Sequence, residues 1–183
     1  AYFKNCFIDG NTDYIFGGGD VLFDACELSY YGYSNTQKGA YITAAADGST
    51  TGYIFRNCYV SANDAWDVAA GYFGRPWRSS ATVAFLNTKL QTKDTVTAVG
   101  WNSMSGARPE DANYQEYNTT VLGSGAADVS ARTAGTVKNE NPYADIVQTF
   151  KGWQPFYFVQ ETDTAVTVKD IAIEGELKTG SVL

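Results

Sequence analysis

A six-residue pattern recurs four times in the first half of the chain. Each copy has phenylalanine first, asparagine or alanine third, a small residue fourth and an aliphatic residue sixth. The copies read FKNCFI, FDACEL, FRNCYV and FLNTKL, and they begin 20, 32 and 30 residues apart, at Phe3, Phe23, Phe55 and Phe85. Periods of about 20–50 residues are the signature of solenoid proteins. The pattern therefore predicts one coil per copy, with insertions at the corners.

Alternation within each copy indicates a β-strand, because alternate side chains of a strand point to opposite faces. Parallel stacking of successive coils would place the four phenylalanines in one ladder and Cys6, Cys26 and Cys58 in another. That ladder would account for the cysteines without any bridge. We therefore expect an all-β fold, a right-handed parallel β-helix in a single domain.

An antiparallel sandwich is the alternative fold, because phenylalanine and valine favour strands in any all-β protein. Sandwich strands usually follow one another every ~8–12 residues with hairpin turns between them. The longer steps in this chain favour the solenoid. The 18 glycines and a charged fraction of only 18% likewise favour turn-rich β structure over a helical bundle.

The second half of the chain departs from the repeat. Residues 107–135 are rich in Gly, Ala, Ser, Thr and Asn, which predicts an extended loop region lying against the solenoid. The stretch Asn141–Trp153 has apolar residues at helical spacing after an Asn-Pro start, so it predicts a short closing helix. We assign residues 1–156 to the solenoid domain and residues 157–183 to a C-terminal extension of unknown role.

Composition excludes several classes of function. The sequence has no histidine, which removes Ser-His-Asp and Cys-His nucleophilic systems and most zinc sites. The net charge is -7 and no basic cluster is longer than a pair, so nucleic acid is not an expected partner. No run of about 18 apolar residues occurs, so no membrane span is expected. Nothing in the sequence indicates a metal, nucleotide or organic cofactor.

The first chemical motif is GNTDYIFGGGD, residues 10–20, in which Asp13 stands between apolar strand residues and a glycine-rich turn. A carboxylate in such a place is either exposed at an edge or held by a cation, because burying it unpaired is costly. From the residues alone, a functional carboxylate and a turn-capping aspartate are equally good interpretations.

The second motif is GYFGRPWRSS, in which Arg75 and Trp77 flank a proline that stiffens the backbone. An arginine can hold a carboxylate through two parallel hydrogen bonds, and tryptophan offers a flat face to a sugar ring. The pair suits a sugar-binding cleft. The alternative is a structural arginine beside a tryptophan that caps the core.

These two motifs together resemble the signature stretches of the pectin methylesterases, and the resemblance spans roughly Tyr2 to Gly125. GWNSMSG from Gly100 and YQEYNTTVLGSGA from Tyr114 resemble the same family, its bacterial members more than its plant members. The resemblance implies a parallel β-helix enzyme that removes methyl esters from pectin, a methyl-esterified homogalacturonan, and releases methanol. It also implies a secreted protein, which we expect to be a monomer.

By this resemblance Asp13 matches the nucleophile, and Arg75 matches the residue that holds it in line. Thr12, Phe16, Trp77 and Met104 match substrate-binding positions, with the two aromatic residues lining the sugar subsites. Cys6 and Cys26 match positions that form a disulfide in some bacterial relatives, which leaves a bridge open beside the unbridged ladder. Asn11 departs from the family pattern, which has a small or hydroxyl residue there.

The family's general acid/base aspartate and two oxyanion-stabilising glutamines precede the Asp13 motif, and this sequence holds no such segment. Loss of oxyanion donors alone costs on the order of 10²–10³ in rate. We therefore expect a C-terminal part of the enzyme, inactive by itself and prone to aggregate at its exposed strand edges. The alternatives are a non-catalytic polysaccharide-binding solenoid, a β-helix lyase or hydrolase of another family, and a structural adhesin repeat.

Overall fold

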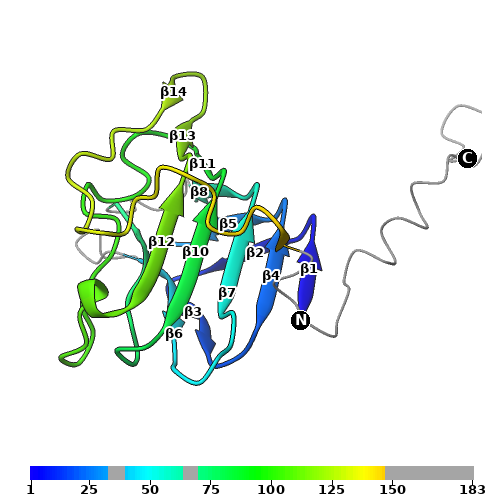
Figure 1. Ribbon diagram of the computed structural model, residues 1–183. Coiled ribbons are helices and arrows are strands. Elements are labelled where there is room, and N and C mark those ends of the chain that lie inside the picture. Colours follow the sequence, from blue (N-terminus) through cyan, green and yellow to red (C-terminus); the bar gives the residue numbers. More distant parts are fainter. Residues whose placement is uncertain (33–39, 64–69, 147–183) are drawn as a thin grey trace, which may run out of the picture.

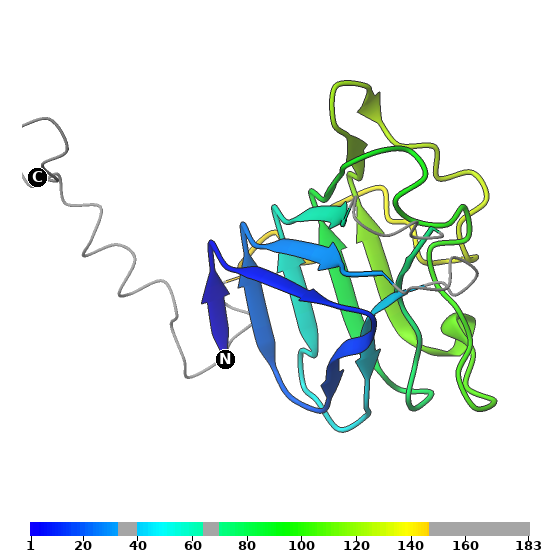
Figure 2. The ribbon, with the colours of Figure 1, turned by 180° about the vertical axis from the view of Figure 1, so that it is seen from behind.

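The structure is a computed structural model that describes residues 1–32, 40–63 and 70–146, and within these residues the chain winds into a solenoid of parallel strands. Each complete coil contributes one short strand to each of three sheets (Figures 1 and 2). Every pair of neighbouring strands is parallel except the last pair of the second sheet. The predicted parallel β-helix is confirmed.

The strands of each sheet follow in coil order. The first sheet contains β1 (Tyr2–Lys4), β4 (Val21–Asp24), β7 (Tyr53–Arg56), β10 (Thr82–Leu86) and β12 (Asn113–Tyr117). The second contains β2 (Phe7–Gly10), β5 (Glu27–Tyr30), β8 (Tyr59–Ala62), β11 (Lys89–Leu90), β13 (Thr120–Val121) and the antiparallel β14 (Gly125–Ala126). The third contains β3 (Thr12–Gly17), β6 (Tyr41–Ala45) and β9 (Tyr72–Gly74), and a single 3₁₀ turn, η1 (Pro109–Asp111), precedes β12.

The predicted phenylalanine ladder runs through the core. Strand register aligns the four first-position residues of the repeat, and their rings stack with centroids 5.2, 4.5 and 4.3 Å apart. Phe55 and Phe85 are fully buried, whereas Phe3 in the first coil is 42% exposed. Stacked aromatic rings stabilise the coils beyond the burial of their area, so this ladder forms the axis of the core.

The next position of the ladder is not a phenylalanine. Strand register aligns Phe85 with Glu116 of β12, whose side chain is buried. Arg132 Nε donates to one carboxylate oxygen at 2.8 Å, and Thr119 Oγ1 donates to the other at 2.7 Å. The predicted loop region 107–135 is therefore wrong in part, because β12 to β14 form a further coil there. The repeat did not show this coil, since a buried ion pair stands where the aromatic ring would be.

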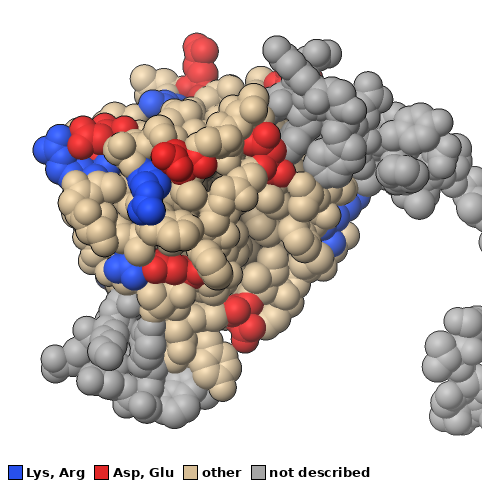
Figure 3. Space-filling view, turned by 90° about the horizontal axis from the view of Figure 1, so that it is seen from below, with Lys and Arg blue, Asp and Glu red and all other residues tan. Residues whose placement is uncertain are grey.

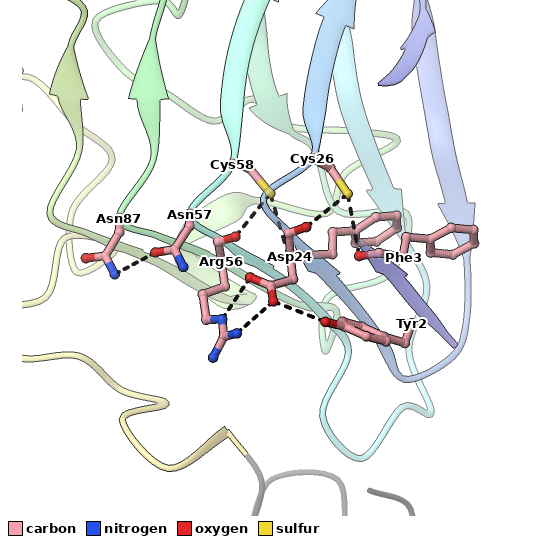
Figure 4. Close-up of polar contacts among 9 residues, drawn as sticks. Tyr2, Phe3, Asp24, Cys26, Arg56, Asn57, Cys58 and Asn87 are labelled. Atoms are coloured by element: carbon pink, nitrogen blue, oxygen red, sulfur yellow. Dashed lines mark hydrogen bonds and ion pairs between the residues drawn. The ribbon is translucent and has the colours of Figure 1, made fainter. Parts of the chain in front are cut away.

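The third position of the repeat is a turn residue with left-handed backbone. Its φ lies between 51° and 57° at Asn5, Ala25, Asn57, Asn87 and Asn118. Asparagine tolerates this conformation better than most residues. The amide of Asn87 donates to Asn57 at 3.1 Å (Figure 4). The amide of Asn118 donates to Asn87 at 2.9 Å. An asparagine ladder thus joins the corners of the last three coils, and Ala25 separates it from Asn5.

The fourth position of the repeat places Cys6, Cys26 and Cys58 on successive coils, and all three are free thiols. Cys26 Sγ donates to the carbonyl of Phe3 at 3.5 Å, and Cys58 Sγ donates to that of Phe23 at 3.6 Å (Figure 4). The disulfide between Cys6 and Cys26 that the resemblance implied is not present. The unbridged arrangement is the one observed, with Cys26 and Cys58 hydrogen-bonded to the coil before them and Cys6 to Lys4 of its own coil.

After β14 the chain crosses the outer face of the first sheet, as the yellow trace in Figure 1 shows. Ile146 is buried there in a second apolar cluster with Leu22, Ile54, Ala84 and Leu86. Residues 142–145 form a turn. The rest of the predicted helix Asn141–Trp153, and the extension 157–183, lie outside the described residues. None of the helical structure in the described part of the chain could cross a lipid bilayer.

Candidate functional site

Asp13 lies on β3, where the strand is irregular. Thr12 pairs with Tyr41 and Ile15 pairs with Thr43, so two residues of β3 oppose one of β6. Asp13, inside this bulge, has a φ of 52°, which aspartate tolerates but most residues do not. Bulges re-aim side chains beside functional sites, and this one places the Asp13 carboxylate at the surface of the third sheet rather than in the core.

The Asp13 carboxylate forms a two-pronged ion pair with Arg75. Nε of Arg75 donates to Oδ1 at 2.9 Å and Nη2 donates to Oδ2 at 2.7 Å. The side chain of Asp13 is 17% exposed and that of Arg75 is 23% exposed. Each carboxylate oxygen has two lone pairs, so the guanidinium orients the carboxylate and leaves it further acceptor capacity on the solvent side.

The GRPW segment is anchored by backbone hydrogen bonds to β6. The backbone N–H of Arg75 donates to the carbonyl of Thr43, and that of Trp77 donates to the carbonyl of Ala45, both at 3.0 Å. Gly74 must be glycine, because a Cβ there would overlap Thr43 Oγ1. This close approach of two coils brings Arg75 within reach of Asp13.

An aromatic stack supports the guanidinium of Arg75. Its Cζ lies 4.1 Å from the ring centroid of Tyr41, and the ring of Tyr41 stacks on that of Tyr72 at 4.9 Å. Nδ2 of Asn102 donates to the hydroxyl of Tyr41 at 2.9 Å. Sequence reasoning missed all three of these polar and aromatic neighbours. The tyrosines of the YITAA and GYFG segments become neighbours only through the register of β6 and β9.

The predicted substrate-binding residues lie on β3, directly after β9 and in the loop that follows. Phe16 follows Asp13 on β3 and is 68% exposed, and Trp77 follows Arg75 and is 38% exposed. Thr12 immediately precedes Asp13 and is exposed. Met104 lies in a loop tied to β9 through Asn102, whose backbone N–H donates to Gly74, and it pairs with Ala107. The structure therefore brings Asp13 and Arg75 into contact, and it leaves Phe16 and Trp77, which follow them in the sequence, exposed.

The core side of the site is aromatic. Trp101, which pairs with Gly74, stacks on the buried ring of Tyr114 at 4.3 Å. Burial, with a smaller contribution from the charge of Asp13, raises the pKa of Tyr114 well above its usual range. The hydroxyl of Tyr114 and Nε1 of Trp101 have no hydrogen-bond partner among the described residues. The core beneath the end of β9 is thus formed by uncharged aromatic side chains.

Two further observations concern the kind of ligand that the site can bind. Across the parts of the chain that the structure describes, no group of three or more potential ligand side chains is suited to a metal ion. Seen from below, charged side chains of both signs lie in small separate groups on a mainly uncharged face (Figure 3). That face offers no continuous basic patch of the kind that binds nucleic acid.

Comparison with known proteins agrees with the geometry. A family model described as pectinesterase matches residues 1–148. The chain belongs to the pectinesterase family. A probable pectinesterase A of Neosartorya fischeri is 38% identical over 136 residues, which make up 72% of this chain and 38% of that protein. A putative pectinesterase of Arabidopsis thaliana is 34% identical over 62% of this chain. The bacterial affinity remains a prediction, since these relatives are fungal and plant proteins.

Solved structures of the family share the fold. The pectin methylesterase of Aspergillus niger is 30% identical, with a TM-score of 0.65 over 81% of this chain and 46% of that chain. A pectin methylesterase solved in complex with a hexasaccharide is 25% identical, with a TM-score of 0.63 over 84% of this chain and 52% of that chain. The chain thus spans about half or less of the family members that it matches.

Proposed function

We propose that the protein containing this chain is a secreted, monomeric esterase that hydrolyses the methyl esters of polygalacturonate. The observation that carries this proposal is the Asp13–Arg75 pair, an oriented and partly exposed carboxylate, with exposed aromatic side chains close by in the sequence at Phe16 and Trp77. Family membership supports it, because the relatives named above are pectinesterases by description. The hexasaccharide complex of a relative supports an oligosaccharide as the kind of ligand.

In the proposed mechanism a carboxylate oxygen of Asp13 attacks the ester carbonyl carbon of a galacturonate unit. The bond from that carbon to the methoxy oxygen breaks, the methoxy group takes a proton, and methanol leaves. The acyl group remains on Asp13 as an anhydride, which water hydrolyses to free galacturonate and the original carboxylate. Arg75 orients the attacking oxygen. Phe16, Trp77, Thr12 and Met104 line the sugar subsites.

We propose that the proton donor and the oxyanion groups come from residues that precede the Asp13 motif in the family. The twelve residues before Asp13 in this sequence contain no glutamine, so the two family glutamines are not among them. The 183-residue chain by itself is then inactive or nearly so. This follows from the cost of losing oxyanion donors and a general acid, each on the order of 10²-fold or more.

A second candidate function is binding of polysaccharide without chemistry, which the exposed rings of Phe16 and Trp77 favour. Methanol release from esterified pectin separates the two. The chain joined to its native upstream sequence is expected to release methanol, and the 183-residue chain is not. If the protein with its upstream sequence folds and binds pectin but releases no methanol, the esterase proposal fails and the binding function takes its place.

A further inference from the structure

Arg75 reaches its partner across an intervening coil. Asp13 lies on β3 and Arg75 follows β9, and in the third sheet β6 lies between these two strands. Neighbouring strands are about 4.8 Å apart, so the arginine side chain has to extend over β6 to form its two hydrogen bonds. A side chain with that many rotatable bonds loses substantial conformational freedom when it is held extended. The residue beneath it on β6 therefore affects how well it is held.

That residue is Tyr41. Strand register places Tyr41 between Thr12 of β3 and Tyr72 of β9, and its ring lies 4.1 Å from Arg75 Cζ. A guanidinium is attracted to the face of an aromatic ring, and it lies flat there more readily than an ammonium does. The Tyr41 ring thereby restricts the position in which Arg75 can present its two donors to Asp13.

Tyr41 is itself held by two neighbours. Its ring stacks on Tyr72 with an angle of only 10° between the planes. Its hydroxyl accepts a hydrogen bond from Asn102 at 2.9 Å, and the backbone N–H of Asn102 donates to Gly74 at 3.1 Å. Asn102 is therefore fixed to the same strand end that carries Arg75. Together these contacts lock the orientation of the Tyr41 ring.

We propose that Tyr41 is a positioning residue that acts through Arg75, and that Asn102 anchors it. This inference rests on the proposed esterase function of Asp13. Tyr41 need not touch the reacting ester to have this effect. It keeps the guanidinium where both carboxylate oxygens of Asp13 are engaged, so its loss lowers the rate of the chemical step through a misplaced Arg75.

The kinetic test uses the protein with its native upstream sequence. Tyr41→Leu is expected to lower kcat for methanol release about 10- to 100-fold while KM changes less than about threefold. Tyr41→Phe keeps the ring but loses the hydrogen bond from Asn102, so Tyr41→Phe and Asn102→Ala are each expected to lose about three- to tenfold. In an Arg75→Ala background, Tyr41→Leu is expected to have less than about a twofold further effect, because the two residues act as a unit. Effects that multiply in the double variant, or a rise in KM alone, would overturn the proposal.

A second readout does not depend on activity. The Nε–H resonance of Arg75, assigned by its absence in Arg75→Lys, reports the hydrogen bond to Asp13. This N–H is expected to be protected from exchange with solvent in the wild type and in Tyr41→Phe. In Tyr41→Leu the protection is expected to be lost although that variant remains folded. Protection that persists in Tyr41→Leu would contradict the positioning role. If the variants show the expected pattern of protection but the wild type releases no methanol, the positioning role of Tyr41 stands and the proposed esterase function fails.

Discussion

At the scale of single residues, left-handed backbone marks both the corners of the solenoid and its candidate nucleophile. Asn5, Asn57 and Asn87 adopt this conformation at corners, and Asp13 adopts it within a strand. Asparagine and aspartate accept the conformation because their short polar side chains form local hydrogen bonds. Ala25 has the same φ without such a side chain, so the second coil retains a strained corner.

Ala25→Asn is therefore expected to stabilise the protein. The new amide would lie between Asn5 and Asn57 in the ladder, and the left-handed strain of alanine would be relieved, a gain of about 1 kcal/mol. In a protein of this size that corresponds to a rise in Tm of about 2–4 °C. Thermal unfolding of Ala25→Asn beside Ala25→Val tests this, since the branched side chain is expected to lower Tm. Equal Tm values for the two variants would contradict the strain argument.

At the scale of coils and strands, the repeat predicted the four stacked phenylalanines but not the buried ion pair that follows them in the next coil. The phenylalanine positions could be predicted because the same side chains meet on every coil. The coil with Glu116 was missed because Glu116 replaces the phenylalanine, although Asn118, Thr119 and Val121 fit the other positions of the repeat. The partner of Glu116, Arg132, lies 16 residues further on, where no local pattern points to it. The contact between Asp13 and Arg75, 62 residues apart, was predicted by the family resemblance and by no local pattern, because only the register of the third sheet brings the two residues together.

The buried pair at the end of the ladder gives a prediction at this scale. The side chains of Arg132 and Glu116 are only 3% and 1% exposed. Arg132→Met is expected to destabilise the protein by about 3–5 kcal/mol, because it leaves a buried carboxylate without its cation. Adding Glu116→Leu is expected to recover most of that loss, since two apolar side chains can replace a buried pair.

Urea unfolding of the single and double variants measures this coupling. Arg108→Met removes the exposed pair with Asp111 and serves as the matched control, for which little change in stability is expected. A double variant no more stable than Arg132→Met would show that the pair does more than neutralise buried charge.

At the scale of the whole molecule, Asp13 lies in the first coil, which is also one end of the described solenoid. β1, β2 and β3 are the edge strands of their sheets, and Phe3 and Phe7 are exposed there. A hollow of about 590 Å³ opens among their side chains, and it is lined by Phe3, Cys6, Phe7, Ile8, Tyr14, Ile15, Phe16, Gly18, Val21, Phe23 and Tyr53. Asp13 thus lies on the coil whose edges are unpaired in the structure. Aggregation of the isolated chain through these edges stays a prediction.

The fold offers an internal control for the central claim, that Asp13 is the nucleophile. Asp24 is held by Arg56 through hydrogen bonds of 3.0 and 2.7 Å, the same two-pronged geometry, but on the first sheet (Figure 4). Tyr2 also donates to Asp24, at 3.1 Å. The two aspartate-arginine pairs therefore share the two-pronged geometry, but they lie on different sheets, and Asp24 has one donor more.

The most direct measurement is methanol release from esterified pectin by Asp13→Asn and Asp24→Asn in the protein with its native upstream sequence. Asp13→Asn is expected to lose at least about 10³-fold in kcat, because an amide cannot form the acyl intermediate. Asp24→Asn is expected to keep kcat and to lower Tm. Activity that survives Asp13→Asn in a folded protein, or that falls equally in both variants, would contradict a nucleophilic role for Asp13.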